Sequence, residues 1–157
     1  MQTLALAKQS YTIIVSDDAV SQWVAERACD GHYDSKTSVS IGLLRGERIV
    51  AGAIFNNYNH QSIQLHMAIE RMNRAFLAML AWYAFDCAKA HKVIAPVSAS
   101  NVRSSRVLEH AGVEFEAVLA NACRDTSDLH LYTMTRMYCP FLDPSYISRL
   151  ESYYGRR

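Results

Sequence analysis

The stretch that decides the fold is residues 65–113, which read LHMAIERMNRAFLAMLAWYAFDCAKAHKVIAPVSASNVRSSRVLEHAGV. Its first part completes a half-apolar strand over 62–69, which a polar turn at 70–73 ends. A long apolar helix over 74–91 follows directly. The first N–H groups of such a helix have no partner within it, and the helix dipole adds positive potential at the same end. The carboxyl end of the strand is therefore expected to face a site suited to a phosphate or pyrophosphate group.

The second part of this stretch repeats the pattern of a strand and a helix. A strand is predicted over 92–99, and a short helix follows over 102–111, with Asn101 or Ser100 as its N-cap. Gly112 stands just beyond this helix, where a glycine commonly ends one. Strands that alternate with helices in this way are typical of a mixed α/β domain.

The flanking sequence predicts the remaining elements of a single domain over 1–157. These are a helix after an Asp17 or Ser16 cap, a glycine-turn hairpin of strands 38–44 and 49–55, a hairpin of strands 113–119 and 129–137, and a tail over 143–157 that is either a small helix or a partner-contact segment. The fold class that follows is a mixed α/β sheet with helices on both faces.

Composition limits the classes of function. Half of the 157 residues are hydrophobic, which suffices for a sizeable core, and the formal net charge is +1. This balance disfavours a general nucleic-acid binder, which usually carries a basic patch and a high pI. The four cysteines lie far apart without CxxC or CxxH spacing, so no metal site is expected.

The N-terminal residues and the apolar runs predict a cytoplasmic protein without a membrane span. Residues 1–10 do not resemble a signal peptide, because the segment is short and Lys8 and Gln9 interrupt it. Free thiols in a reducing cytoplasm are then expected. The longest apolar run, 75–85, falls well short of the ~20 residues that a membrane span needs, so it is expected to be a buried helix.

Two stretches carry a resemblance to a known family. They are residues 101–113, NVRSSRVLEHAGV, and residues 128–139, DLHLYTMTRMYC. Together with the NRAF motif at 73–76, they resemble the GNAT superfamily of acyl-CoA-dependent N-acetyltransferases, and most of all its small phage-encoded members and its ribosomal-protein branch. The resemblance implies two splayed central strands with acetyl-CoA in the gap, an amine acceptor, and, for a phage-encoded protein, the host cytoplasm as location.

The resemblance also assigns residues to acetyl-CoA. In the family a bulged strand offers backbone N–H groups to the pantetheine arm and the acyl carbonyl, the next helix start binds the pyrophosphate, and an Asn and a small residue lie near the thiol. The corresponding residues are Met67, Ala68, Ile69, Asn73, Arg74, Ala75, Phe76, Asn101 and Ser104. An ordinary core strand and an ordinary N-cap are the alternatives.

Two family features are absent from this sequence. The pyrophosphate loop usually contains glycine, whereas residues 71–76 read RMNRAF, and Arg74 is expected to replace some of that binding with charge-assisted hydrogen bonds. A tyrosine that commonly protonates the leaving thiolate is replaced by Leu108. Ser104, a nearby tyrosine such as Tyr132, or water is then left to supply that proton.

The acceptor amine must lose a proton, so a base is needed within hydrogen-bond reach. Glu70 and His66 lie on one face of the predicted strand and are the candidates, with Glu70 favoured. A structural role is the alternative for each. His32 and Tyr33, in the loop after the first helix, are expected on the acceptor side, with a plain turn as the alternative.

Three functions stay open at this point. The leading one is an N-acetyltransferase that acts on a protein N-terminus or lysine. A small amine or a nucleobase is the alternative acceptor, although the balanced charge disfavours nucleic acid. The third is a catalytically silent module that binds CoA or a partner protein. A homodimer is one option for its assembly.

Overall fold

The structure, a computed structural model, describes residues 10–28 and 33–154. Its elements are β1 (Tyr11–Val15), α1 (Asp18–Ala28), β2 (Val39–Arg45), β3 (Arg48–Asn56), β4 (Ser62–Ile69), α2 (Arg74–Trp82), η1 (Tyr83–Cys87), β5 (Lys92–Ser98), α3 (Val102–His110), β6 (Glu114–Leu119), β7 (Leu129–Thr135), η2 (Arg136–Tyr138) and α4 (Pro144–Tyr154). The sequence did not predict β1, because so short an apolar run has no period that identifies it.

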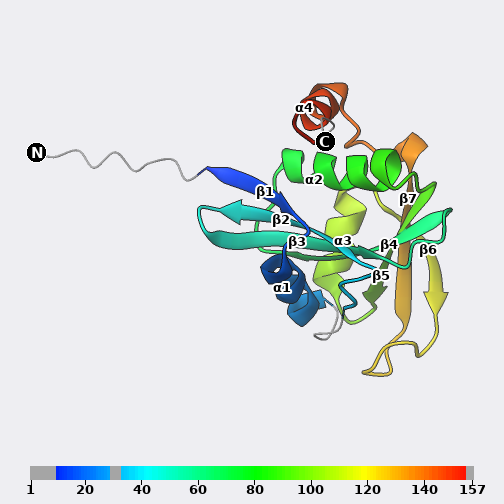
Figure 1. The fold of residues 1–157 in the computed structure, drawn as a ribbon. Helices are drawn as coiled ribbons and strands as arrows, with labels where there is room; N and C mark the ends of the chain where they lie inside the picture. Colours follow the sequence, from blue (N-terminus) through cyan, green and yellow to red (C-terminus); the bar gives the residue numbers. More distant parts are fainter. Residues whose placement is uncertain (1–9, 29–32, 155–157) are drawn as a thin grey trace, which may run out of the picture.

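The strands form one seven-stranded sheet in the order β1-β2-β3-β4-β5-β7-β6. β4 and β5 are parallel, and the other neighbouring strands are antiparallel. α1 covers one face of the sheet and α2 covers the other (Figure 1). The predicted fold class, a mixed sheet with helices on both faces, is confirmed.

α1 lies close to the sheet because two glycines leave room for it. A Cβ atom on Gly42 would lie 2.5 Å from the side chain of Val20, and one on Gly52 would lie 2.4 Å from that of Val24. The predicted N-cap is also present, since the N–H of Val20 donates to Oδ1 of Asp17 at 3.0 Å. The α1 face of β2 and β3 is therefore tightly covered.

The helix predicted over 74–91 ends earlier than expected. A π-helical turn over Tyr83–Cys87 replaces its last regular turns, and Lys89 then adopts a φ of +57°. The N–H of Ala90 donates to the carbonyl oxygen of Ala84 at 3.0 Å, which closes the helix end. The predicted end at residue 91 was wrong because no glycine marks this left-handed stop.

The apolar run of α2 is buried in the core, as predicted. Phe76 and Met79 are almost fully covered by the sheet and its neighbours. Among residues 10–28 and 33–154, no helix is long and apolar enough to cross a membrane.

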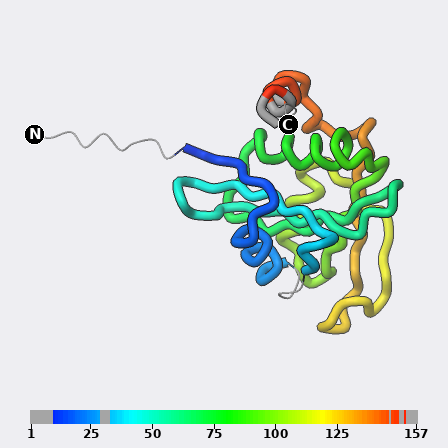
Figure 2. The backbone as a smooth tube through the Cα atoms, viewed as in Figure 1, coloured from blue at the N-terminus to red at the C-terminus, as the bar shows by residue number. Residues whose placement is uncertain are grey.

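The last elements of the chain, the final hairpin and the tail, agree with the sequence prediction. β6 and β7 form a hairpin at the edge of the sheet (Figure 2), and Gly112 has a φ of +81° after α3. The tail contains a helix, α4, which lies on the outer side of α2 (Figure 1). Phe141 and Ile147 pack against the core there, so the small-helix alternative is confirmed for this part of the tail.

Candidate active site

β4 and β5 separate in the middle of the sheet. Ser62 pairs with Lys92, and the pairing ends where Gln64 meets Ile94. Because the two strands are parallel, the gap opens toward the carboxyl ends of both. The predicted splay of the central strands is therefore present.

The gap exposes backbone donors of β4. The N–H of Glu70 donates to the carbonyl oxygen of Val50 on β3 at 2.8 Å. Donors alternate sides along a strand, so the N–H groups of Met67 and Ile69 are directed the other way, into the gap. Ala68 lies opposite Gly52 of β3 and its N–H is directed to that strand. Of the three predicted pantetheine contacts on this strand, two thus present their N–H groups to the gap.

The expected bulge does not lie within 65–69. The register with β3 runs without a shift from Gln64 to Ile69. The irregularity comes just afterwards, where the N–H of Arg71 also donates to Val50 O, at 2.9 Å. A bulge is not needed to free donors here, because the departure of β5 already leaves one edge of β4 unpaired.

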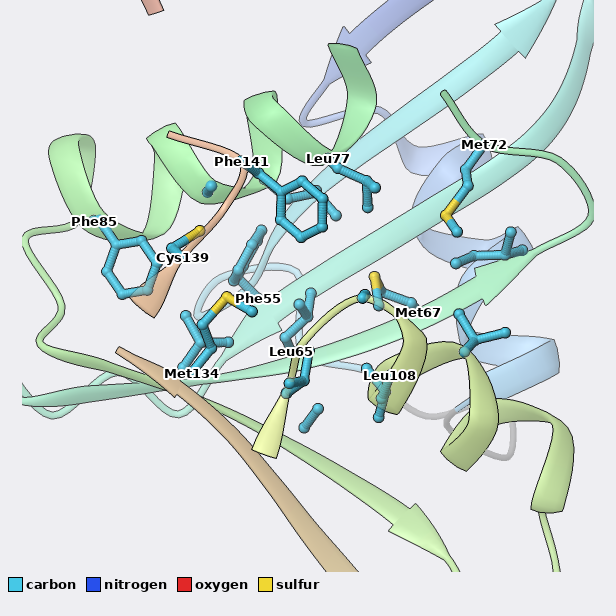
Figure 3. Close-up of a pocket in the computed structure, with 18 residues that line it drawn as sticks. Phe55, Leu65, Met67, Met72, Leu77, Phe85, Leu108, Met134, Cys139 and Phe141 are labelled. Atoms are coloured by element: carbon cyan, nitrogen blue, oxygen red, sulfur yellow. The ribbon is translucent and has the colours of Figure 1, made fainter. Parts of the chain in front are cut away.

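An apolar pocket lies beside this gap, on the face of the sheet that α2 and α3 cover (Figure 3). Its volume is about 70 Å³. Met67 of β4, Leu77 of α2 and Leu108 of α3 line it, together with residues of the segment that follows β7. Leu108 lines this pocket, at the position where the family commonly has the tyrosine that protonates the leaving thiolate. The arrangement suits a flexible, largely apolar arm rather than a hydrated ligand.

The N-terminus of α2 lies at the carboxyl end of β4, and both the N–H of Phe76 and the side chain of Arg74 already have internal partners. Oδ1 of Asn73 accepts a hydrogen bond from the N–H of Phe76 at 2.8 Å. Nη2 of Arg74 lies 3.7 Å from Oδ2 of Asp143, and the Arg74 side chain is 57% exposed. An exposed arginine can exchange such a partner for a phosphate at little cost.

Asn101 caps α3, as the sequence predicted. Its Oδ1 accepts a hydrogen bond from the N–H of Ser104 at 3.1 Å. This bond uses the amide oxygen and leaves the Nδ2 donors for another partner. Ser104 is half-buried in the first turn of α3. Both residues can therefore serve the helix and a ligand at once.

A hydroxyl and carboxylate network, which the sequence did not predict, holds the turn before Asn101. Oγ of Ser100 donates to Oδ2 of Asp125 at 3.0 Å, and Oγ of Ser98 lies 2.8 Å from Oγ of Ser127. Hydrogen bonds from Ser127 and then from Ser100 lower the pKa of Asp125. The spacing of these small polar residues resembles an ordinary loop, and only the fold brings the two segments together.

His66 is held by Asn56 in a half-buried position. Nε2 of His66 lies 3.2 Å from Oδ1 of Asn56. An amide oxygen only accepts, so Nε2 carries the ring proton and Nδ1 keeps its lone pair. Burial lowers the pKa of His66 below its usual 6.5. The ring is therefore neutral at neutral pH, which is the form that can take up a proton.

Glu70 lies at the end of β4 and is occupied by an ion pair. Its Oε2 lies 2.5 Å from Nη2 of Arg48. Four residues of a strand separate it from His66, a distance of roughly 13 Å. The two candidate bases thus share a side of the strand without forming a pair.

His66 and Tyr33 lie on the face of the sheet opposite the apolar pocket. His66 lies directly across from Ile54, which packs against α1. Tyr33 packs against the same cluster. His32 lies outside the described residues. The gap is therefore approached from two sides, by an apolar pocket on one face and by a neutral histidine on the other.

The tyrosine considered as a proton donor is already engaged. Tyr132 is buried, and its hydroxyl donates to Oε1 of Glu109 on α3 at 3.2 Å. A thiolate would have to compete with that carboxylate for the proton. Across the part of the chain that the structure describes, no group of three or more His, Cys, Asp and Glu side chains could hold a metal ion.

No protein-family model and no curated protein matches this sequence. Solved structures do resemble it. Mutant forms of the spermidine/spermine N-acetyltransferase SpeG from Vibrio cholerae superpose with a TM-score of 0.65 at 12% identity, over 89% of this chain and 99% of that one. A dodecameric spermidine N-acetyltransferase from Vibrio cholerae gives 0.56 at 12% identity, over 77% and 70%.

A third similar structure is the ribosomal-protein-S5-alanine acetyltransferase from Vibrio fischeri. Its TM-score is 0.56 at 14% identity, over 67% of this chain and 66% of that one. At such identities the likeness establishes the fold. The protein therefore has the fold of the GNAT acetyltransferases, and the structures that it resembles are acetyltransferases.

Proposed function

We propose that this protein is an N-acetyltransferase that moves an acetyl group from acetyl-CoA to a primary amine. The observation that carries the proposal is the gap between β4 and β5. Backbone donors of Met67 and Ile69 line its edge, an apolar pocket lies beside it, and the start of α2 stands at its open end. The backbone donors suit the amides of CoA, the apolar pocket suits the apolar links between them, and the start of α2 suits the phosphates.

The donor side of the site is built from backbone and apolar groups. The amides of the pantetheine arm pair with the N–H groups of Met67 and Ile69 as an added strand would. Nδ2 of Asn101 donates to a carbonyl of the arm, and Arg74 contacts the pyrophosphate in place of Asp143. The N–H groups that face the gap also stabilise the oxyanion that forms when the thioester is attacked.

The chemical step needs a base on the opposite face. Nδ1 of His66 takes the proton of the amine as its nitrogen attacks the thioester carbonyl carbon. A C–N bond forms, the C–S bond breaks, and the CoA thiolate leaves with a proton from Ser104 or water. His66 fits this role better than Glu70, because Glu70 lies beyond the end of the strand and is paired with Arg48.

For the acceptor we propose an amine of a protein, at its N-terminus or on a lysine. His66 is hydrogen-bonded to Asn56 and lies directly opposite Ile54, and both of these residues are uncharged. A polyamine carries several positive charges and would gain from carboxylates at that position. The likeness to spermidine N-acetyltransferases keeps a small amine as the second candidate.

The test combines binding with turnover. Calorimetric titration with acetyl-CoA is followed by measurement of thiol release with an N-terminal peptide, a lysine peptide and spermidine. Binding with peptide-dependent thiol release is expected, and spermidine-dependent release would instead select the small amine. Binding without release from any of the three would favour a silent CoA-binding module. No binding at millimolar acetyl-CoA would overturn the proposal.

A further inference from the structure

The apolar pocket extends further than the gap that opens onto it. Figure 3 shows Met72 at one end of the pocket and Phe85 at the other, with Leu65 and Met67 between them. The end near Met72 lies at the carboxyl end of β4, where the strands are apart. The other end includes Val93, which still pairs with Ile63 of β4. Part of the pocket therefore lies beyond the point where the strands close.

We call this part the closed half and define it by Phe55, Phe85, Val93, Met134 and Cys139. Its walls are hydrocarbon, thioether and one thiol, and burial raises the pKa of the Cys139 thiol, so that it stays uncharged at neutral pH. Protein interiors are normally packed to the density of organic crystals. An apolar space of about 70 Å³ is thus an exception in this core.

The kind of ligand that such an apolar space binds can be predicted. Apolar cavities stay dry and bind apolar molecules, even when they exceed the ~10–15 Å³ that one water needs. Met134 has a flexible thioether side chain that can adapt to the shape of a bound group. The closed half is therefore suited to a short hydrocarbon chain, and it lies next to the point where the gap between β4 and β5 closes.

We propose that the closed half holds the acyl chain of the donor, and that the preferred donor is a short-chain acyl-CoA with an acyl group longer than acetyl. The inference rests on the proposed acyltransfer function and names the acyl group. The whole pocket measures about 70 Å³, and ~10–15 Å³ of such space already holds one water, so its closed part has room for a short chain of about two methylene units. Butyryl-CoA is accordingly the donor that fits.

The test is a calorimetric titration of the full chain with CoA, acetyl-CoA, propionyl-CoA, butyryl-CoA and hexanoyl-CoA. Affinity is expected to rise from acetyl to butyryl by up to about fourfold per buried methylene, and then to stop rising. Equal affinity for acetyl-CoA and butyryl-CoA, or tighter acetyl-CoA binding, would overturn the inference while leaving the proposed function intact. Failure of every ligand, CoA included, would overturn both.

A matched pair of variants tests where in the pocket the acyl chain of the donor lies. Cys139→Leu fills the closed half and should remove the advantage of butyryl-CoA without weakening acetyl-CoA. Val107→Leu adds bulk at the α3 wall of the pocket, outside the closed half, and it should affect the binding of acetyl-CoA and butyryl-CoA equally. Retention of the butyryl preference in Cys139→Leu would contradict the placement. If that variant does not fold, the titration of the unmodified protein still decides whether butyryl-CoA binds more tightly than acetyl-CoA.

Discussion

Nε2 of His66 lies 3.2 Å from Oδ1 of Asn56, and this contact assigns the ring proton to Nε2. The lone pair of Nδ1 is then left for a proton of the acceptor. Burial keeps the ring neutral by lowering its pKa. The contact with Asn56 thus sets the tautomer and the orientation of the proposed base, and burial sets its protonation state.

Asn56→Asp should raise the pKa of His66, because a carboxylate at this distance stabilises the imidazolium. A base acts in its neutral form, so activity rises with pH through the His66 pKa. In the unmodified protein this acid limb of the kcat/KM profile lies below pH 6.5, since burial lowers that pKa. The limb should move upward by about one pH unit or more in the variant.

The control for this prediction is Asn59→Asp, which adds the same charge in the loop before β4. Its Oδ1 can go on accepting from the N–H groups of Gln61 and Ser62. The acid limb should stay in place there. An unmoved limb in Asn56→Asp would show that His66 is not the titrating base.

His66→Gln and Glu70→Gln should differ strongly in turnover. Loss of a general base costs ~10²–10⁴-fold, so His66→Gln should fall in this range at neutral pH, with acetyl-CoA affinity nearly unchanged. Glu70→Gln weakens only an exposed pair with Arg48 and should keep most of its activity. Steady-state kinetics with calorimetry measure both quantities. The reverse order of the two defects would restore Glu70 as the base.

Arg74 and Asp143 should have opposite effects on acetyl-CoA binding. Arg74→Ala should weaken acetyl-CoA about tenfold through loss of a charge-assisted hydrogen bond, and should leave acetyl-pantetheine unaffected because it lacks the pyrophosphate. Asp143→Asn should tighten acetyl-CoA by a few-fold, since Asp143 competes for the same guanidinium. Asparagine keeps an oxygen that can accept from the Ser145 N–H, so α4 should remain intact. Equal losses for both ligands in Arg74→Ala would indicate a structural role.

Asp125 should act on acetyl-CoA through Asn101. Asp125→Ala removes the acceptor of Ser100 and should loosen the turn that presents Asn101, which would weaken acetyl-CoA by a few-fold. In an Asn101→Ala background the same change should have almost no further effect, because neighbouring residues in one network are not additive. Calorimetric titration of the four proteins gives the coupling. Additive losses would mean that the two residues act independently.

Local signals predicted most of the fold. The polar turn at 70–73 and Asn101 mark where α2 and α3 begin, and Gly112 marks the end of α3. These signals act within a few residues of chain, so they can be read without knowing the fold. The end of α2 escaped prediction because Lys89 takes the left-handed conformation that glycine usually signals.

The sequence by itself determined the order of the main elements after β1, the caps and the apolar core, because periodicity and capping are local properties of the chain. Only the tertiary structure decided which polar groups meet. It paired His66 with Asn56, Glu70 with Arg48 and Arg74 with Asp143, across separations of 10, 22 and 69 residues. Contacts of that kind depend on strand register and helix packing, and no local pattern encodes them.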